Sequence, residues 1–262
     1  PIGNLVDDFE MRDGTKFDWN NPQHRAEPYK NREPRFYATI LYNEAPWRVR
    51  PLDAQGLDPH NRVQTGSWEV WNPTTNSINI VYGVDTRNST IEDWNGSYTG
   101  YYCRKYIDPN IDAQYVKQTV TWRFIRYAEI LLNYAEACIE LGEEEEARKY
   151  INMVRRRAGL PGISESGEEL KKRYRNERRI ELAFEDHRFY DVRRWAIGPE
   201  AYQPVKIAKI VYKLNPDKTT ATRPTVTHEE WESRSWNEKA YFLPIMRDEM
   251  NKNSALIQNP GY

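Results

Sequence analysis

The sequence predicts a mainly α-helical chain built on a helical hairpin of the tetratricopeptide type, with a long loop-rich portion and minor short strands. Apolar residues at helical spacing are concentrated between about residues 121 and 200. Residues 1–120 instead place aromatic side chains among Pro, Asn, Gly and Asp, which interrupt regular structure. We therefore expect one domain with three parts: 1–120 loop-rich with short strands, 121–200 a helical core, and 201–262 mixed loops and a C-terminal tail.

Composition and charge exclude several classes of protein. The chain has 262 residues, with 38 Lys and Arg against 39 Asp and Glu, so its formal net charge is −1. This balance argues against a general nucleic-acid binder, which would carry a basic surface. No apolar run approaches the ~20 residues that a membrane-spanning helix needs. The 9 Trp and 18 Tyr supply enough apolar surface for a folded chain.

The loop-rich part contains two segments with strand-like composition. Residues 34–42 and 100–107 are rich in β-branched and aromatic side chains, which predicts short strands or extended pieces. Turn signals such as Asn72–Pro73 and Asn95–Gly96 recur around them. Long irregular segments in a compact protein usually carry function, so ligand contacts are expected in this part.

Two amphipathic helices follow in close succession. The first has apolar residues at helical spacing from Phe124 to Ile139 and ends at Gly142. The second begins with four glutamates and ends with Arg155–Arg157, charges that complement the helix dipole at both ends, before Gly159 stops it. A tight turn between two such helices predicts an antiparallel hairpin, the unit of tetratricopeptide solenoids.

A third helix is predicted over about 168–188. Leu170, Tyr174, Ile180 and Phe184 form a looser apolar stripe along it. Beyond residue 199 we expect mixed loop, with a short helix near 246–251.

Three glutamates on the third helix form the strongest candidate for a catalytic site. Glu177, Glu181 and Glu185 recur every four residues, which places their carboxylates on one helix face. Glycosidases need two carboxylates that flank the scissile bond, whereas these emerge from a single wall. We favour an ion-pair network that locks the helix onto its neighbours, with partners among the nearby arginines: Arg178, Arg188, Arg193 and Arg194.

Other chemistries have little support. The histidines show no metal-ligand spacing, so no metal site is predicted, and no cofactor motif is present. Cys138 lies on an apolar helix face, where a thiol is normally inert, and with Cys103 it cannot form a disulfide framework. The four histidines are His24, His60, His187 and His228.

Aromatic residues in the loop-rich part are the candidate ligand contacts. Trp and Tyr rings match the C–H faces of sugar rings, and neighbouring polar side chains can bond the hydroxyls. The alternative is that these tryptophans fill small cores under the loops. The candidates are Trp47, Trp68, Trp71 and Trp94.

Five motifs follow one another along the chain. They are NREPRFYATILYN, TGYYCRKYID, the hairpin FIRYAEILLNYAEACIELG with INMVRRRAGLPGI, NERRIELAFEDHRFYDVRRW, and the tail YFLPIMRDEMNKNSALIQNPGY. In this order they resemble the SusD/RagB family of outer-membrane nutrient-binding lipoproteins. The resemblance spans almost the whole chain, from Phe9 to Tyr262, and corresponds to the C-terminal half of such a protein.

The resemblance implies a SusD-like fold and a non-enzymatic protein that captures oligosaccharides, or peptides in some relatives. Such proteins face outward from the outer membrane and deliver their cargo to a TonB-dependent, SusC-like transporter. The N-terminal half would carry the signal peptide, the lipidated cysteine and most of the tetratricopeptide helices, and would be a partner of this chain. The family has no fixed ligand motif, so the four tryptophans rest on composition alone.

Three other functions remain open at this point. One is capture of a peptide by the same aromatic side chains. Another is glycoside hydrolysis by Glu177, Glu181 or Glu185. The last is a helical adaptor that binds partner proteins through an exposed face of the hairpin and has no small-molecule ligand.

Overall fold

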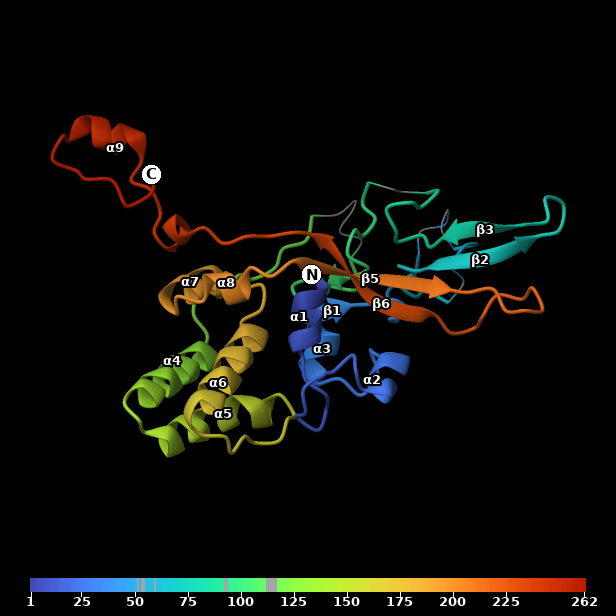
Figure 1. Cartoon of the computed structure of the whole chain (residues 1–262). Helices are drawn as coiled ribbons and strands as arrows, with labels where there is room; N and C mark the ends of the chain where they lie inside the picture. Colours follow the sequence, from blue (N-terminus) through green and yellow to red (C-terminus); the bar gives the residue numbers. More distant parts are fainter. Residues whose placement is uncertain (51, 53–54, 59, 92–93, 112–116) are drawn as a thin grey trace.

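The computed structural model describes residues 1–50, 52, 55–58, 60–91, 94–111 and 117–262. Helices α4 (Tyr127–Glu140), α5 (Glu144–Arg157) and α6 (Gly167–Glu181) form one end of the molecule, and a four-stranded sheet extends from the other (Figure 1). The short helices α1 (Gly3–Asp8), α2 (Pro22–Ala26) and α3 (Pro34–Thr39) lie between them.

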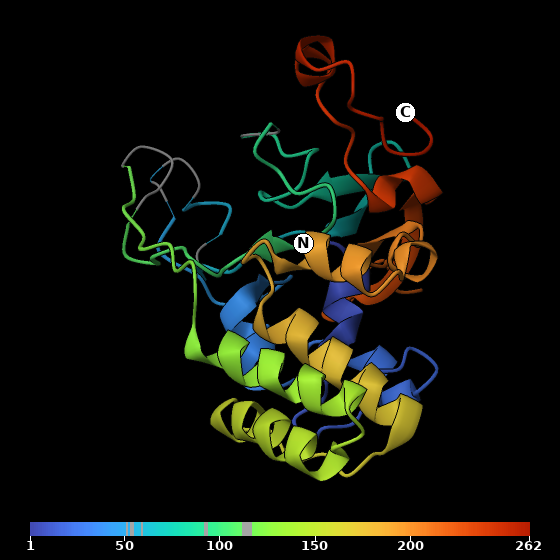
Figure 2. The same ribbon diagram turned by 90° about the vertical axis from the view of Figure 1, so that its left-hand side faces the viewer.

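The helical end confirms the predicted hairpin. Helices α4 (Tyr127–Glu140) and α5 (Glu144–Arg157) lie side by side, and α6 (Gly167–Glu181) packs behind them (Figure 2). The apolar stripes of the three helices meet in one core, which removes those side chains from water. This core contains Leu131, Leu132 and Ala135 from α4, Ile151 and Val154 from α5, Ile163, and Leu170 and Tyr174 from α6.

Glycines end both helices of the hairpin as predicted. Gly142 has φ of +79°, and the next amide, that of Glu143, donates to the Cys138 carbonyl at 2.8 Å. Gly159 has φ of +78°, and the Leu160 amide donates to the Arg155 carbonyl at 2.9 Å. Both ends are Schellman motifs, in which a left-handed residue turns the chain back over the last helical carbonyls.

The prediction of one helix over 168–188 is wrong. Helix α6 ends at Glu181, and α7 (His187–Arg194) starts after a turn in which Phe184 and Asp186 have φ of 63° and 64°. These left-handed residues interrupt the helical hydrogen bonds. The turn brings Glu185 onto Arg126 and Lys105, residues distant in sequence, so the cause of the break is tertiary. A further short helix, α8 (Gly198–Ala201), follows α7.

A four-stranded sheet occupies the other end, with strand order β3-β2-β5-β6. Strands β2 (Ser67–Asn72) and β3 (Ser77–Tyr82) form an antiparallel hairpin, β5 (Val205–Tyr212) runs parallel to β2, and β6 (Thr225–Glu232) runs antiparallel to β5. The prediction of mixed loops over 201–262 is therefore wrong for β5 and β6. The predicted mainly helical character holds for 121–200 and is incomplete elsewhere.

The two strand predictions in the loop-rich part are correct only in part. Residues 34–39 form α3, which Pro34 begins in the first helical turn, where a missing N–H costs nothing. Only Ile40–Leu41 (β1) and Tyr102–Cys103 (β4) are strands. The two pair with each other in antiparallel register.

One aromatic core joins the two ends of the molecule. Phe36 of α3 lies at its centre, in edge contact with Phe9 and Tyr37. Ile180 of α6 and Ile210 of β5 pack in the same core, so the sheet and the helical unit are held on one apolar interior.

The C-terminal segment leaves this body. A 3₁₀ helix, η1 (Glu238–Tyr241), precedes α9 (Arg247–Lys252), which confirms the short helix predicted near 246–251. Figure 1 shows α9 projecting from the rest of the chain.

Candidate functional site

The three candidate catalytic glutamates lie in a buried cluster of charged side chains. Glu177 and Glu181 are on α6, and Glu185 is in the turn after it. Their residues are only 2%, 5% and 6% exposed. The structure thus brings the three together, although Glu185 is not on the helix that holds the other two.

Arginines from distant parts of the chain neutralise these carboxylates. Arg35 of α3 lies 2.6 Å from a Glu177 oxygen and 3.0 Å from a Glu181 oxygen. Arg126 contacts Glu181 at 2.9 Å and Glu185 at 2.6 Å, and Lys105 contacts Glu185 at 2.5 Å.

Arg155 of α5 extends the cluster to the N-terminal segment. Its Nη1 lies 2.9 Å from Glu177, and its Nη2 lies 2.8 Å from Glu10. The cluster therefore ties α3, α5, α6 and the segment after α1 together, which confirms the predicted ion-pair network.

The predicted partners of this network are wrong. Arg178 and Arg194 instead hold Asp191 of α7, with Nε to carboxylate distances of 2.8 and 2.9 Å. Arg193 donates to the Phe189 carbonyl at 2.9 Å. Arg188 makes no hydrogen bond or ion pair with any residue that the structure describes. Helical spacing identified the glutamates of the network, but only the fold determines which basic side chains pair with them.

The electrostatics of the cluster argue against acid catalysis. Burial alone raises the pKa of Glu181, but Arg35, Arg157 and Arg126 outweigh it, and the pKa lies below its usual value. Burial likewise raises the pKa of Glu185, and the bonds from Arg126 and Lys105 lower it further than burial raises it. Both carboxyls are ionised at neutral pH, whereas a glycosidase acid needs a raised pKa.

These shifts predict a loss of stability in acid. Because the folded pKa of Glu181 and Glu185 lies below the unfolded one, their stabilisation is present above the unfolded pKa, about 4.3. It is lost as the pH falls through the folded pKa. Urea denaturation between pH 6 and pH 3 should therefore show a falling free energy of unfolding, with a shallower fall in Glu181→Gln. Glu33 and Asp8 cannot cause this fall, because burial raises their pKa and their contribution to stability increases as the pH falls. An equally steep fall in Glu181→Gln would contradict the assignment to Glu181.

The four histidines do not come together. His228 is held by Asp7 at 3.1 Å and Tyr101 at 2.7 Å, and the His24 ring stacks on Phe17. His187 lies 3.7 Å from Glu129. Within the described ranges, no group of three or more His, Cys, Asp or Glu side chains is placed to hold a metal ion.

The structure separates the four candidate tryptophans. Trp68 on β2 stacks on Tyr212 of β5 with ring centroids 4.6 Å apart and an interplanar angle of 4°. Trp47 packs on the small core of Leu41, Ala45 and Val63. These two rings therefore pack against small cores, as in the alternative prediction, and their contact with a ligand stays a prediction.

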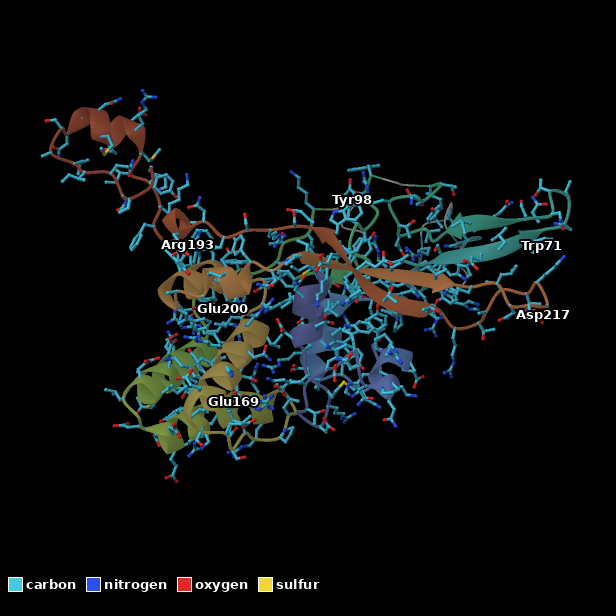
Figure 3. All side chains as sticks on the ribbon, viewed as in Figure 1. Trp71, Tyr98, Glu169, Arg193, Glu200 and Asp217 are labelled. Carbon is cyan, nitrogen blue, oxygen red and sulfur yellow. The ribbon has the colours of Figure 1, made fainter. Side chains whose placement is uncertain are left out.

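Trp71 is partly buried, as are Trp47 and Trp68, and Trp94 alone of the four is largely exposed. Lys218 Nζ lies 3.9 Å from the centre of the Trp71 ring, at the far end of the sheet (Figure 3). Trp94 lies in the loop between β3 and β4 and is 69% exposed. No ring–ring contact joins any two of the four, all of which are described.

The Trp94 backbone lies beside an exposed aromatic pair, Tyr98 and Trp231, to which Arg87 links it. We call Trp94, Tyr98, Trp231 and the cation Arg87 the aromatic platform. Tyr98 and Trp231 are 58% and 59% exposed, and their ring centroids are 6.3 Å apart. Arg87 lies 4.4 Å from the centre of the Tyr98 ring and donates to the Trp94 carbonyl. Figure 3 shows Tyr98 above the sheet, well away from Trp71.

A β-bulge supplies the third ring of the platform. On β5, Val205 and Lys206 are adjacent, but they pair with Glu232 and Glu230 of β6, so Trp231 is the extra residue. A bulge re-aims the side chain at that position, and bulges are frequent next to functional sites. Sequence reasoning missed Trp231 because residues 225–232 do not alternate in hydrophobicity. It also missed Tyr98, for which the aromatic composition of the segment around Trp94 was the available signal.

In the described part of the chain, no helix is both long and apolar enough to cross a membrane.

Both the sequence and the fold of this chain are similar to those of known proteins. The sequence profile of the SusD family matches residues 1–262. A SusD-like protein from Bacteroides fragilis has a solved structure with 35% identity and a TM-score of 0.72, over all of this chain and 46% of that one. A SusD-like carbohydrate-binding protein from the same organism has 25% identity and a TM-score of 0.64, over 97% of this chain and 47% of that one.

A curated relative points the same way. SusD-like protein P2 of Formosa agariphila is 34% identical over 149 residues, which are 53% of this chain and 25% of that protein. The chain therefore spans less than half the length of these relatives. Since the family profile matches every residue from the first to the last, the chain belongs to the SusD family.

Proposed function

We propose that this chain is part of a non-catalytic protein that captures oligosaccharides through the aromatic platform. The observation that carries this is the platform itself, in which a β-bulge sets the exposed Trp231 ring beside the exposed Tyr98 ring, and Arg87 links Tyr98 to the backbone of the exposed Trp94. Exposed aromatic rings are costly in water unless a partner covers them. Aromatic faces suit sugar rings, and one solved relative is described as carbohydrate-binding.

The ion-pair cluster supports the non-catalytic part of the proposal. Each of Glu177, Glu181 and Glu185 forms an ion pair with a basic side chain. None of the three carboxyls is therefore free to protonate a leaving group. The hydrolase alternative thus lacks a free acid.

We further propose that the cargo passes to a SusC-like, TonB-dependent transporter, and that the protein faces outward from the outer membrane on a lipid anchor in an N-terminal segment. These steps rest on the family alone. The N-terminal half as a partner has support in the structure, because apolar side chains on α4 and on either side of it face solvent. Those most exposed are Phe124 at 84%, Ile125 at 71%, Tyr127 at 70% and Leu141 at 75%.

Calorimetric titration of the full-length protein against plant, host and microbial oligosaccharides, with oligopeptides included, tests the capture role. We expect saturable binding with a Kd in the micromolar to millimolar range, a binding free energy of about −8 to −4 kcal/mol, with the sugar recovered intact. Cleaved sugar would favour the hydrolase. Binding of oligopeptides alone would favour peptide capture, and no binding at all would favour the adaptor.

A further inference from the structure

A second aromatic site lies away from the platform, in a pocket of about 430 Å³. We call it the tyrosine pocket and define it by Tyr29, Tyr37, Tyr42, Glu27, Glu44 and Arg223. Small-molecule sites have volumes of about 300–1,000 Å³ and combine aromatic walls with a few polar groups. The volume and the residues of this pocket fit that description.

The three tyrosines form a connected wall. The Tyr42 ring lies 4.7 Å from that of Tyr29 and 6.0 Å from that of Tyr37. The Tyr37 hydroxyl is occupied, since it donates to the Tyr29 carbonyl at 2.8 Å. The Tyr42 hydroxyl has no hydrogen-bond partner among the described residues, so it is available to a ligand.

A partly buried chain of hydrogen bonds fixes Tyr29 from behind. Its hydroxyl donates to that of Tyr101 at 3.2 Å, and the Tyr101 hydroxyl lies 2.7 Å from Nε2 of His228. Nδ1 of His228 lies 3.1 Å from Asp7, which also accepts a bond from Trp19 at 2.9 Å. Four side chains thus hold the Tyr29 ring in place at one wall of the pocket.

Glu44 is held in an unfavourable conformation at the pocket. Its φ of 68° is left-handed, which costs a non-glycine residue about 1–3 kcal/mol, and such strain concentrates at ligand sites. One carboxylate oxygen accepts a bond from the Tyr212 hydroxyl at 2.7 Å. The other oxygen has no partner in the described part of the chain and can accept a bond from a ligand.

The charges at the pocket disfavour an ionic ligand of either sign. Glu27 lies 2.9 Å from Lys30 and 3.8 Å from Arg223, so it already balances part of the positive charge at the rim. Lys30 and Arg223 repel a cation, while Glu44 repels an anion. A neutral polyol with an apolar face meets both the aromatic wall and the free hydrogen-bonding groups.

We propose that the tyrosine pocket binds one neutral pyranose unit of the captured oligosaccharide. Its C–H face lies on Tyr42 and Tyr29, and its hydroxyls bond to Glu44, Tyr42 and Arg223. The inference rests on the proposed capture of oligosaccharides, but it assigns a site separate from the platform.

Ligand-observed NMR titration of the full-length protein tests this, with D-glucose, D-galactose, D-mannose, D-xylose and L-fucose as probes. We expect at least one to bind with a millimolar Kd, at least tenfold more weakly in Glu44→Gln and Tyr42→Ala and about twofold to fivefold more weakly in Tyr42→Phe. Tyr190→Phe on α7 is the matched control, and circular dichroism with thermal unfolding checks that each variant folds.

The outcomes separate this inference from the proposed function. If oligosaccharides bind and depend on Trp231, but no monosaccharide binding responds to Glu44 or Tyr42, the pocket assignment is overturned alone. If neither oligosaccharides nor monosaccharides bind, both are overturned. If glucosamine or a lysine methyl ester binds more tightly than the neutral sugars, the pocket is a cation site and the inference is wrong.

Discussion

Arg155→Met is expected to lower the free energy of unfolding by about 3–5 kcal/mol, the usual cost of removing one partner from a buried ion pair. The Arg155 residue is 1% exposed, and its guanidinium lies between Glu10 and Glu177. Without it, two buried carboxylates lose a shared cation and the link between α5, α6 and the N-terminal segment. Urea denaturation followed by circular dichroism measures the change.

Lys172→Met is the matched control for this variant. Lys172 is on the same helical unit and pairs with Glu169 at 2.6 Å, but the pair is exposed and water screens it. No measurable change is expected there. A loss of less than about 1 kcal/mol in Arg155→Met would show that Arg35 and Arg173 already satisfy the two glutamates, and the cluster would not be a principal tie between the elements.

Trp231→Ala is expected to weaken binding of the best oligosaccharide from the calorimetric panel by about 30-fold. Stacking contributes about 0.5–1.5 kcal/mol beyond area burial. About 40 Å² of lost apolar contact adds about 1 kcal/mol. The total of about 2 kcal/mol corresponds to that factor in Kd. Calorimetric titration of the variant and the parent protein gives the comparison.

Two further variants show whether the geometry of the platform matters. Gly96→Ala should also weaken binding, because a Cβ at that position overlaps the backbone of Thr86 and displaces the loop that carries Trp94 and Tyr98. Trp122→Ala removes a half-exposed ring that packs on Tyr106, outside the platform, and should leave Kd unchanged. Equal losses in Trp122→Ala and Trp231→Ala would place the binding site elsewhere.

The helical unit could be predicted from the sequence because its determinants are local. Gly142 and Gly159 end the two helices of the hairpin, and the apolar residues of each helix repeat at helical spacing. The break after Glu181 could not be predicted, since it depends on Arg126 and Lys105, which are distant in sequence.

The sheet was missed because strands depend on their partners more than helices do. Residues 225–232, of sequence THEEWE after a Thr–Val pair, have no alternating apolar pattern, and they form β6 because β5 offers a pairing edge. The hairpin β2–β3 had a turn signal at Asn72–Pro73, but β3 is exposed along its length and has no buried face to set a pattern.

For the candidate sites, the sequence by itself determined which residue types are available. It identified the acidic face of Glu177 and Glu181, and it found Trp94 in an aromatic loop. Only the tertiary structure decided that Arg35 and Arg155 neutralise those glutamates, and that a bulge sets Trp231 beside Tyr98. The physical reason is that charge pairing and ring contact act through space over a few ångströms, between residues that a one-dimensional pattern does not connect.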